Sequence, residues 1–200
     1  ACLMRLDALA GNNALKEQLA AHSRGRGLAH AYILAGPRGI GKHTLARALA
    51  AALVCTGSGE RPCGQCAACR KTAGGIHPDI ITVAGEPGKD LTVAQIREMR
   101  ADAYIRPNEA ERKVYLIENA QSMNPSAQNA MLKLLEEGPS YAVFLLLAEN
   151  GTALLPTVRS RCELLSLTPL SRQEAEHWLK LRFPKVSPEA VTAAAIRSGG

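Results

Sequence analysis

The segment AYILAGPRGIGKHTLARALA, residues 31 to 50, constrains the fold more than any other part of the chain. It has the pattern of an apolar strand, a glycine-rich loop and a helix, and Gly36, Gly41 and Lys42 fit GxxxxGK, with Gly39 as an additional glycine. Small residues let backbone N–H groups close around phosphate oxygens, and the helix N-terminus and the lysine add positive charge. The segment therefore predicts a phosphate-binding loop, with a plain turn as the alternative.

Five short apolar runs predict the strands of the domain, and helical patterns separate them. The runs cover residues 31–35, 80–84, 114–117, 143–148 and 163–167. Because strands alternate with helices, the fold class we expect is α/β, with a parallel sheet covered by helices on both faces.

Capping residues mark where the helices begin and end. Thr92 followed by Gln95 forms a capping box. Asn124 and Pro125 are predicted as the N-cap and first residue of a second helix, which Gly138 ends.

The pattern becomes purely helical after residue 168. A capping box at Ser171 and Glu174 begins one helix and Ser187 begins another, with no strand following. We therefore place a domain boundary here, with an α/β domain over residues 1–168 and a helical element over residues 169–200.

Two positions that an ATPase uses for hydrolysis are altered. His43 follows the loop lysine, where the hydroxyl of Ser or Thr binds Mg²⁺, and one further residue along the helix turns Thr44 by about 100°. Glu118 and Asn119 follow the third apolar run, where a Walker B motif has Asp and Glu. Glu118 keeps a negative charge, although it could also be a solvated carboxylate, whereas the amide of Asn119 cannot act as a general base. The pattern predicts a degenerate site, doubtful in its binding of ATP and magnesium, that does not hydrolyse ATP.

Four of the six cysteines follow the spacing C x7 C x2 C x2 C, at Cys55, Cys63, Cys66 and Cys69. Two consecutive CxxC steps can direct thiolates at one centre, so we predict a structural zinc site, with disulfides as the alternative. Cys2 and Cys162 lie outside this cluster and are expected to be free thiols.

Charge and hydropathy bear on whether the protein binds nucleic acid and whether it is a membrane or secreted protein. The net charge of +6 is scattered along the chain and permits phosphate contacts with nucleic acid, but with 4% aromatic residues there is little for base stacking. No apolar run approaches the roughly 20 residues of a membrane helix, and the N-terminus lacks the order of a signal peptide. We therefore expect a cytoplasmic protein.

With these motifs in place, the sequence resembles the AAA+ clamp-loader subunits of bacterial DNA polymerase III over nearly the whole chain. The resemblance includes the phosphate loop, the cysteine insertion after its helix, the acidic strand end, AQNAMLKLLEEGP at residues 127–139 and LLPTVRSRC at residues 154–162. It implies a five-stranded sheet in the order 5-1-4-3-2 and the start of a helical lid. It also implies a role in DNA replication, in which such subunits load the sliding clamp onto primed DNA.

In that family, the arginine of the SRC motif reaches the ATP site of a neighbouring subunit. The resemblance assigns this role to Arg161, whose guanidinium is always charged and suits phosphate oxygens; from sequence alone it would be a surface or ion-pairing residue. His43 and Asn119 depart from the ATP-hydrolysing gamma/tau members, so the chain resembles the delta-prime type, a partner of gamma/tau and delta. An active gamma/tau-type ATPase and a zinc-knuckle module that binds nucleic acid are the alternatives.

The resemblance also places adenine-side contacts at Gly11, Asn12 and residues 30–32, and a sensor at Glu149 or Asn150. The family's usual Gly-Gln is altered at Gly11 and Asn12, which argues against tight ATP binding, and the sensor position, where a Thr is common, also departs.

The family's second sensor and its collar domain, which joins subunits into a ring, would lie beyond residue 200. We therefore expect a truncated chain, monomeric by itself, with Ala1 as a remnant of cloning. The full-length protein is expected to form a hetero-oligomer.

Overall fold

The computed structural model describes residues 4–24, 28–86 and 88–198, so the predictions made for Ala1, Cys2 and the last two glycines lie outside the described residues. Five parallel strands form one sheet in the order β2 (Ile80–Val83), β3 (Lys113–Ile117), β4 (Ala142–Ala148), β1 (Ala31–Ala35) and β5 (Glu163–Ser166). The predicted order 5-1-4-3-2 is confirmed.

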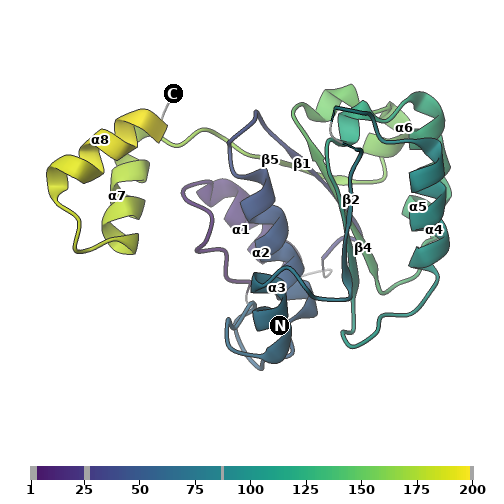
Figure 1. The fold of residues 1–200 in the computed structure, drawn as a ribbon, viewed down its shortest axis with the longest axis horizontal. Helices are drawn as coiled ribbons and strands as arrows, with labels where there is room; N and C mark the ends of the chain where they lie inside the picture. Colours follow the sequence, from purple (N-terminus) through teal and green to yellow (C-terminus); the bar gives the residue numbers. More distant parts are fainter. Residues whose placement is uncertain (1–3, 25–27, 87, 199–200) are drawn as a thin grey trace.

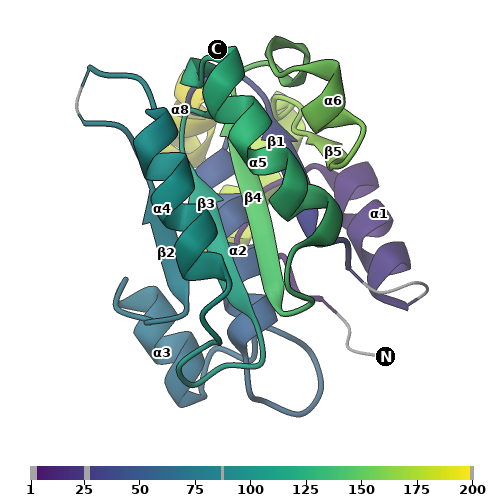
Figure 2. The same cartoon turned by 90° about the vertical axis from the view of Figure 1, so that its right-hand side faces the viewer.

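Helices cover both faces of the sheet (Figure 1). One face carries α1 (Asn13–Arg24), α2 (Lys42–Val54) and α3 (Ala67–Ala73). The other carries α4 (Val93–Ala103), α5 (Pro125–Glu137) and α6 (Pro156–Arg159), with α4 and α5 crossing the sheet in Figure 2. Short 3₁₀ helices, η1 (Ala120–Ser122) and η2 (Gly151–Ala153), follow β3 and β4.

The last two helices, α7 (Arg172–Arg182) and α8 (Pro188–Ser198), pack on each other to one side of the sheet layers (Figure 1). The domain boundary near residue 168 stays a prediction. No helix in the described part of the chain is both long enough and apolar enough to span a lipid bilayer.

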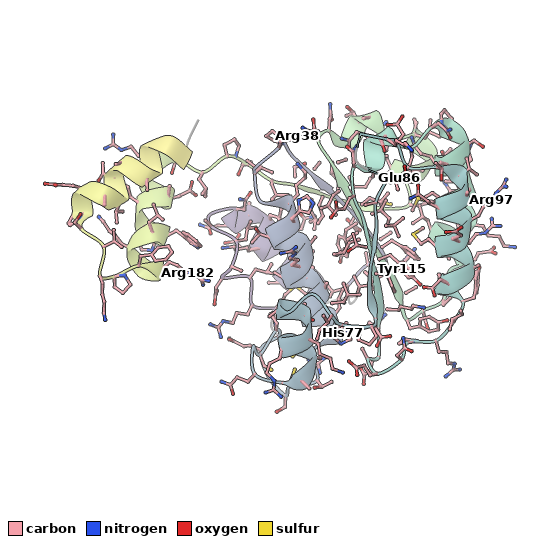
Figure 3. The ribbon with its side chains drawn as sticks, viewed as in Figure 1. Arg38, His77, Glu86, Arg97, Tyr115 and Arg182 are labelled. Carbon is pink, nitrogen blue, oxygen red and sulfur yellow. The ribbon has the colours of Figure 1, made fainter. Side chains whose placement is uncertain are left out.

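Alternation along the strands divides the core into two halves. Tyr32 and Leu34 face the cluster formed with α1 and α2, whereas Ile33 faces the cluster formed with α4 and α5. In the second cluster the paired residues Tyr115 and Phe144 stack with ring centroids 5.2 Å apart and an interplanar angle of 14°. Figure 3 shows Tyr115 between the sheet and the two long helices. Both faces of every central strand are therefore buried, as its nearly continuous apolar sequence predicts.

The predicted helix starts are confirmed. Thr92 and Gln95 form a reciprocal capping box, as do Ser171 and Glu174, and the side chain of Asn124 accepts a 2.8 Å hydrogen bond from the N–H group of Ala127. Each cap satisfies N–H groups that would otherwise lack a partner in the first helical turn.

Strand β3 begins at the charged residue Lys113, just before the apolar run. Its side chain is 3% exposed, and its ammonium group donates hydrogen bonds to the carbonyl oxygens of Asp102 (2.9 Å) and Ile105 (3.3 Å). The Asp102 carboxylate, 2.9 Å away, compensates the buried charge. A lysine can therefore join the strand because its charge is satisfied at the end of α4.

A buried carboxylate, Asp79, caps the loop that leads into β3. It accepts hydrogen bonds from the N–H groups of Asn108 (2.5 Å), Glu109 (2.9 Å) and Ala110 (2.8 Å) and from the amide of Asn108 (3.1 Å). Burial opposes ionisation, but these donors more than offset it and lower the pKa of Asp79.

We expect Asp79→Ala to lower the free energy of unfolding by about 3 kcal/mol, because it leaves several buried donors without an acceptor. Urea denaturation checks this, with exposed Asp90→Ala as the matched control of near-zero effect. Since the folded pKa is depressed, the ionised carboxylate stabilises the fold fully above the unfolded pKa of about 3.9. This stabilisation is lost as the pH falls through the pKa of Asp79 in the folded state. Equal losses of stability in Asp79→Ala and Asp90→Ala at neutral pH would contradict this role of Asp79.

Candidate functional site

The carboxyl ends of the central strands bring the predicted nucleotide-site residues together. The phosphate loop follows β1, Glu118 follows β3 and Glu149 follows β4, and β1 lies between β4 and β5, where the strand order reverses. In open α/β sheets, ligands bind in the crevice at such a point. The structure therefore places the glycine loop, Glu118 and Glu149 at the carboxyl ends of neighbouring strands, whereas residues 30–32 lie at the opposite end of β1.

The phosphate loop adopts a backbone that glycine alone accommodates readily. Gly39 and Gly41 have φ angles of 79° and 105°, in the left-handed region, and a Cβ atom at Gly41 would lie 3.2 Å from Leu9 Cδ1. Gly36 joins the loop to the sheet, since its N–H group donates a 3.2 Å hydrogen bond to the carbonyl of Ala148. The glycine-rich turn between β1 and α2 is thus present, and its binding of phosphate stays a prediction.

Lys42 folds back onto its own loop. Its side chain is buried, and the ammonium group donates to the carbonyl oxygens of Gly36 and, at 2.7 Å, Pro37. Burial and the nearby charge of Arg38 lower the pKa of Lys42, against the opposing effect of Glu149. An incoming phosphate would have to displace these carbonyl contacts.

A chain of polar contacts crosses the mouth of the loop. Arg38 Nε lies 2.7 Å from Glu149 Oε1, and Figure 3 shows Arg38 at the outer end of the loop. The Glu149 N–H group donates a 3.3 Å hydrogen bond to Gln121 Oε1, and Gln121 Nε2 donates to Asn119 Oδ1 at 2.5 Å. The candidate sensor Glu149 is therefore paired with the loop, whereas the other candidate, Asn150, caps η2. Which of the two would sense nucleotide stays a prediction.

The two predicted magnesium positions contact each other. His43 Nε2 lies 3.4 Å from Glu118 Oε1, and both side chains are partly exposed. Asn119 has φ 51° and ψ 47°, a left-handed conformation that Asn adopts more readily than most residues. Thr44 lies on the exposed side of α2 and lines a groove of ≈ 1020 Å³ with Arg47 and residues of the cysteine insertion.

The residues predicted near adenine are engaged in contacts within the protein. Asn12 Oδ1 accepts a 2.7 Å hydrogen bond from the N–H group of Thr168. Tyr32 is buried and its hydroxyl accepts from Ala29 N at 2.8 Å, while His30 contacts the carbonyl of Leu135. Their contact with nucleotide stays a prediction.

The four clustered cysteines converge on one point. The Sγ atoms of Cys55, Cys63, Cys66 and Cys69 all lie within 4.8 Å of one another. Cys55 and Cys66 are 3.9 Å apart and Cys63 and Cys69 are 4.0 Å apart. Four thiolates at about 2.3 Å from a tetrahedral zinc ion would be separated by about 3.8 Å. The cluster thus fits a tetrahedral metal and does not contain the disulfides considered as an alternative.

Backbone N–H groups stabilise negative charge in the cluster. Gly57 and Cys63 donate to Cys55 Sγ, and Cys66 donates to Cys63 Sγ, each at 3.4 Å. Burial opposes ionisation of Cys66, but donors including the N–H group of Cys69 lower the pKa of this thiol to about 5, whereas burial and the neighbouring thiols Cys66 and Cys55 raise the pKa of Cys69 to about 12. Deprotonated thiols are the form that binds metal.

Cys162 lies apart from the cluster and is a free thiol, as expected. Burial raises its pKa to about 12, so the thiol is neutral near pH 7.

An ion pair that the sequence analysis missed links the cysteine insertion to the sheet domain. Lys71 on α3 lies 2.5 Å from Glu109, whose N–H group is held by Asp79. The buried His77, shown beside α3 in Figure 3, accepts a 3.1 Å hydrogen bond from Asp79 N at Nδ1, and its Nε2 lies 3.5 Å from Glu109 Oε1. No local sequence pattern marks these residues, because they meet only through the fold.

Arg161 lies in the short loop between α6 and the edge strand β5. Its side chain is 29% exposed. Its Nη1 donates to Thr157 O at 2.7 Å and contacts Ser160 Oγ at 3.4 Å, and its Nη2 donates to Glu136 on α5. None of these contacts of Arg161 is to the glycine loop of its own chain, and its action on a neighbouring ATP site stays a prediction.

Comparison with known proteins shows the family. Residues 11–171 match the family described as DNA polymerase III, delta subunit. The chain is 40% identical over 179 residues to DNA polymerase III subunit delta-prime of Pseudomonas aeruginosa, covering 86% of this chain and 53% of that protein. It is 36% identical over 184 residues to the delta-prime subunit of Escherichia coli, covering 91% of this chain and 54% of that protein. The chain thus spans about half the length of these relatives.

Solved structures support the fold. The Thermotoga maritima RuvB Holliday junction branch migration motor aligns with a TM-score of 0.58 at 19% identity, covering 94% of this chain and 57% of that chain. A Thermotoga maritima protein related to the DNA polymerase III gamma subunit aligns with a TM-score of 0.54 at 18% identity, covering 92% and 58%. Both likenesses show the expected AAA+ architecture. Together with the family match and the delta-prime relatives, they establish that the chain belongs to the delta-prime family of DNA polymerase III clamp-loader subunits.

Proposed function

We propose that the full-length protein is a clamp-loader subunit of DNA polymerase III that does not itself hydrolyse ATP. It would work in the cytoplasm beside gamma/tau and delta subunits, helping to load the sliding clamp onto primed DNA. The observation that carries the proposal is the 3.4 Å contact between His43 and Glu118, the two positions at which a working site holds magnesium.

Physical chemistry explains why this contact matters. Mg²⁺ demands near-ideal octahedral coordination by hard oxygen ligands, and imidazole is not among its preferred ligands. His43 therefore takes the place of a hydroxyl ligand and also contacts the carboxylate of Glu118, which the Walker B position would offer to the ion. Asn119 cannot accept the proton of an attacking water, so the step after binding lacks its base. The site keeps an anion-binding backbone and lacks the groups for hydrolysis.

We expect the purified full-length protein alone to show no magnesium-dependent ATP turnover above background, and to bind ATP weakly with little effect of magnesium. Steady-state hydrolysis and nucleotide titration with and without Mg²⁺ check this. Lys42→Ala is the control, because any turnover that survives it comes from a contaminating enzyme. Robust magnesium-dependent turnover that Lys42→Ala abolishes would instead support an active gamma/tau-type ATPase.

The contribution of this subunit to the loader is, in our proposal, Arg161. It lies at an edge of the sheet and is partly exposed. A guanidinium placed against a neighbour's ATP would stabilise the charge on the transferring phosphoryl group.

We further propose that the cysteine cluster holds structural zinc. All four of its positions are occupied by thiolates, which leaves no position for water or substrate. We also propose that α7 and α8 begin the helical lid, over residues 169–200, of the longer protein.

A further inference from the structure

The carboxylate of Glu136 contacts the proposed finger. Glu136 lies in the last turn of α5, far from Arg161 in sequence, and its Oε1 accepts a hydrogen bond from Arg161 Nη2. Arg161 Nη1 donates to the carbonyl of Thr157 at 2.7 Å. The guanidinium is thus held at two different nitrogen atoms by acceptors from two different elements.

Holding two nitrogens fixes the plane of the group as well as its position. Arginine loses considerable rotamer freedom when it is ordered, and a side chain ordered in advance does not bear that cost when it meets its ligand. Arg161 Nε is buried without a hydrogen-bond partner among the described residues, so the inner end of the guanidinium is also enclosed. An arginine has five N–H donors, and after these contacts Nη2 retains one donor for an outside acceptor.

We infer that Glu136 is a positioning residue for Arg161, holding the guanidinium in a fixed orientation at the subunit surface for the phosphate of a neighbour's ATP. The inference rests on the proposed function, in which Arg161 acts in trans. Glu136 itself touches no nucleotide in this role and acts only through the arginine.

Glu137 provides a matched control. It is the next residue on α5, has the same charge and is exposed, and the described contacts include none from its carboxylate to Arg161. If only the negative charge at the end of α5 mattered, Glu136→Ala and Glu137→Ala would lower ATP turnover equally. Loss of the hydrogen bond to Arg161 affects only the Glu136 variant.

We expect Glu136→Ala in the full-length subunit, reconstituted with its gamma/tau and delta partners, to lower the maximal rate of DNA-stimulated ATP hydrolysis about tenfold. Glu137→Ala should leave it unchanged. Glu136→Gln should lie between wild type and alanine, because its amide oxygen still accepts a hydrogen bond without the charge. As it preserves the side-chain shape, it also carries the test if the alanine variant is unstable.

A double-mutant cycle separates positioning from a structural role. Combined with Arg161→Ala, the Glu136 substitution should cause no further loss, since the group that it positions is absent. Equal, independent losses in both backgrounds, or an unchanged rate for Glu136→Ala and Glu136→Gln, would overturn the inference while leaving the finger in place. An unchanged rate for Arg161→Ala alone would overturn the proposed finger and, with it, this role of Glu136.

Discussion

ATP turnover by the reconstituted loader is expected to fall about 10³-fold when Arg161 is replaced by alanine, with the fold of the subunit intact. In related phosphoryl-transfer systems an arginine supplied from a neighbour contributes at least this much, because it meets charge that grows in the transition state in a site shielded from water. The measurement is single-turnover hydrolysis in the assembled complex, with thermal unfolding of the subunit recorded beside it.

Arg159 is the matched control for this experiment. It lies two residues earlier, in α6, carries the same charge and is exposed to solvent. Arg159→Ala should change turnover little, and lysine at position 161 should restore little, since an ammonium group cannot reproduce the planar fork of a guanidinium. Equal losses for Arg159→Ala and Arg161→Ala would point to the basic charge of the surface and away from a finger.

Removing zinc is expected to unfold the cysteine insertion. We expect the protein to bind one zinc ion per chain. The double substitution Cys63→Ser and Cys66→Ser, or a strong chelator, should remove this ion. Binding of structural zinc contributes on the order of 10 kcal/mol to folding in small metal-dependent units, far more than the short helix α3 could supply alone. Metal analysis gives the stoichiometry, and limited proteolysis over residues 55–75 reports the local unfolding.

Cys162→Ser is the control for the zinc experiment. This thiol lies outside the cluster, so its variant should keep the full zinc content and the same protease pattern. Full retention of zinc by the double variant, or an unchanged protease pattern after complete metal removal, would contradict a structural metal at this site.

Much of the fold was predictable because local patterns and tertiary structure agree. The glycine loop, the capping boxes and the buried strands each have a short-range signature, and strand bounds differ from prediction by at most one residue at each end. The convergence of the cysteines was predictable for the same reason, since CxxC spacing is itself a geometric constraint.

The side-chain contacts around the glycine loop, Arg161 and Asp79 were not predictable from the sequence. Arg38 and Glu149 are separated by 111 residues, and Arg161 and Glu136 by 25, so no sequence period links either pair. The inward fold of Lys42 depends on backbone carbonyls, which every residue possesses and sequence cannot distinguish. Asp79 gave no signal because a carboxylate beside a strand is common, and its burial depends on a loop some 30 residues away.

Helix α5 joins two regions that the fold otherwise keeps apart. It starts at the cap Asn124, just beyond the contacts of Asn119 and Gln121, and its last turn carries Glu136, which contacts Arg161 in the loop before β5. In its first turn, the buried Gln128 donates to Met123 O at 2.9 Å and accepts from Leu155 N at 2.7 Å, which fastens the helix to the chain before α6. Because Gln128 and Glu136 attach α5 to the chain before α6 and to Arg161, we expect the helix and residues 155–161 to move as one rigid unit. If the proposed finger meets a neighbouring subunit at this edge, we expect Arg161 to move together with α5, so that the docking of the subunits sets the alignment of the arginine.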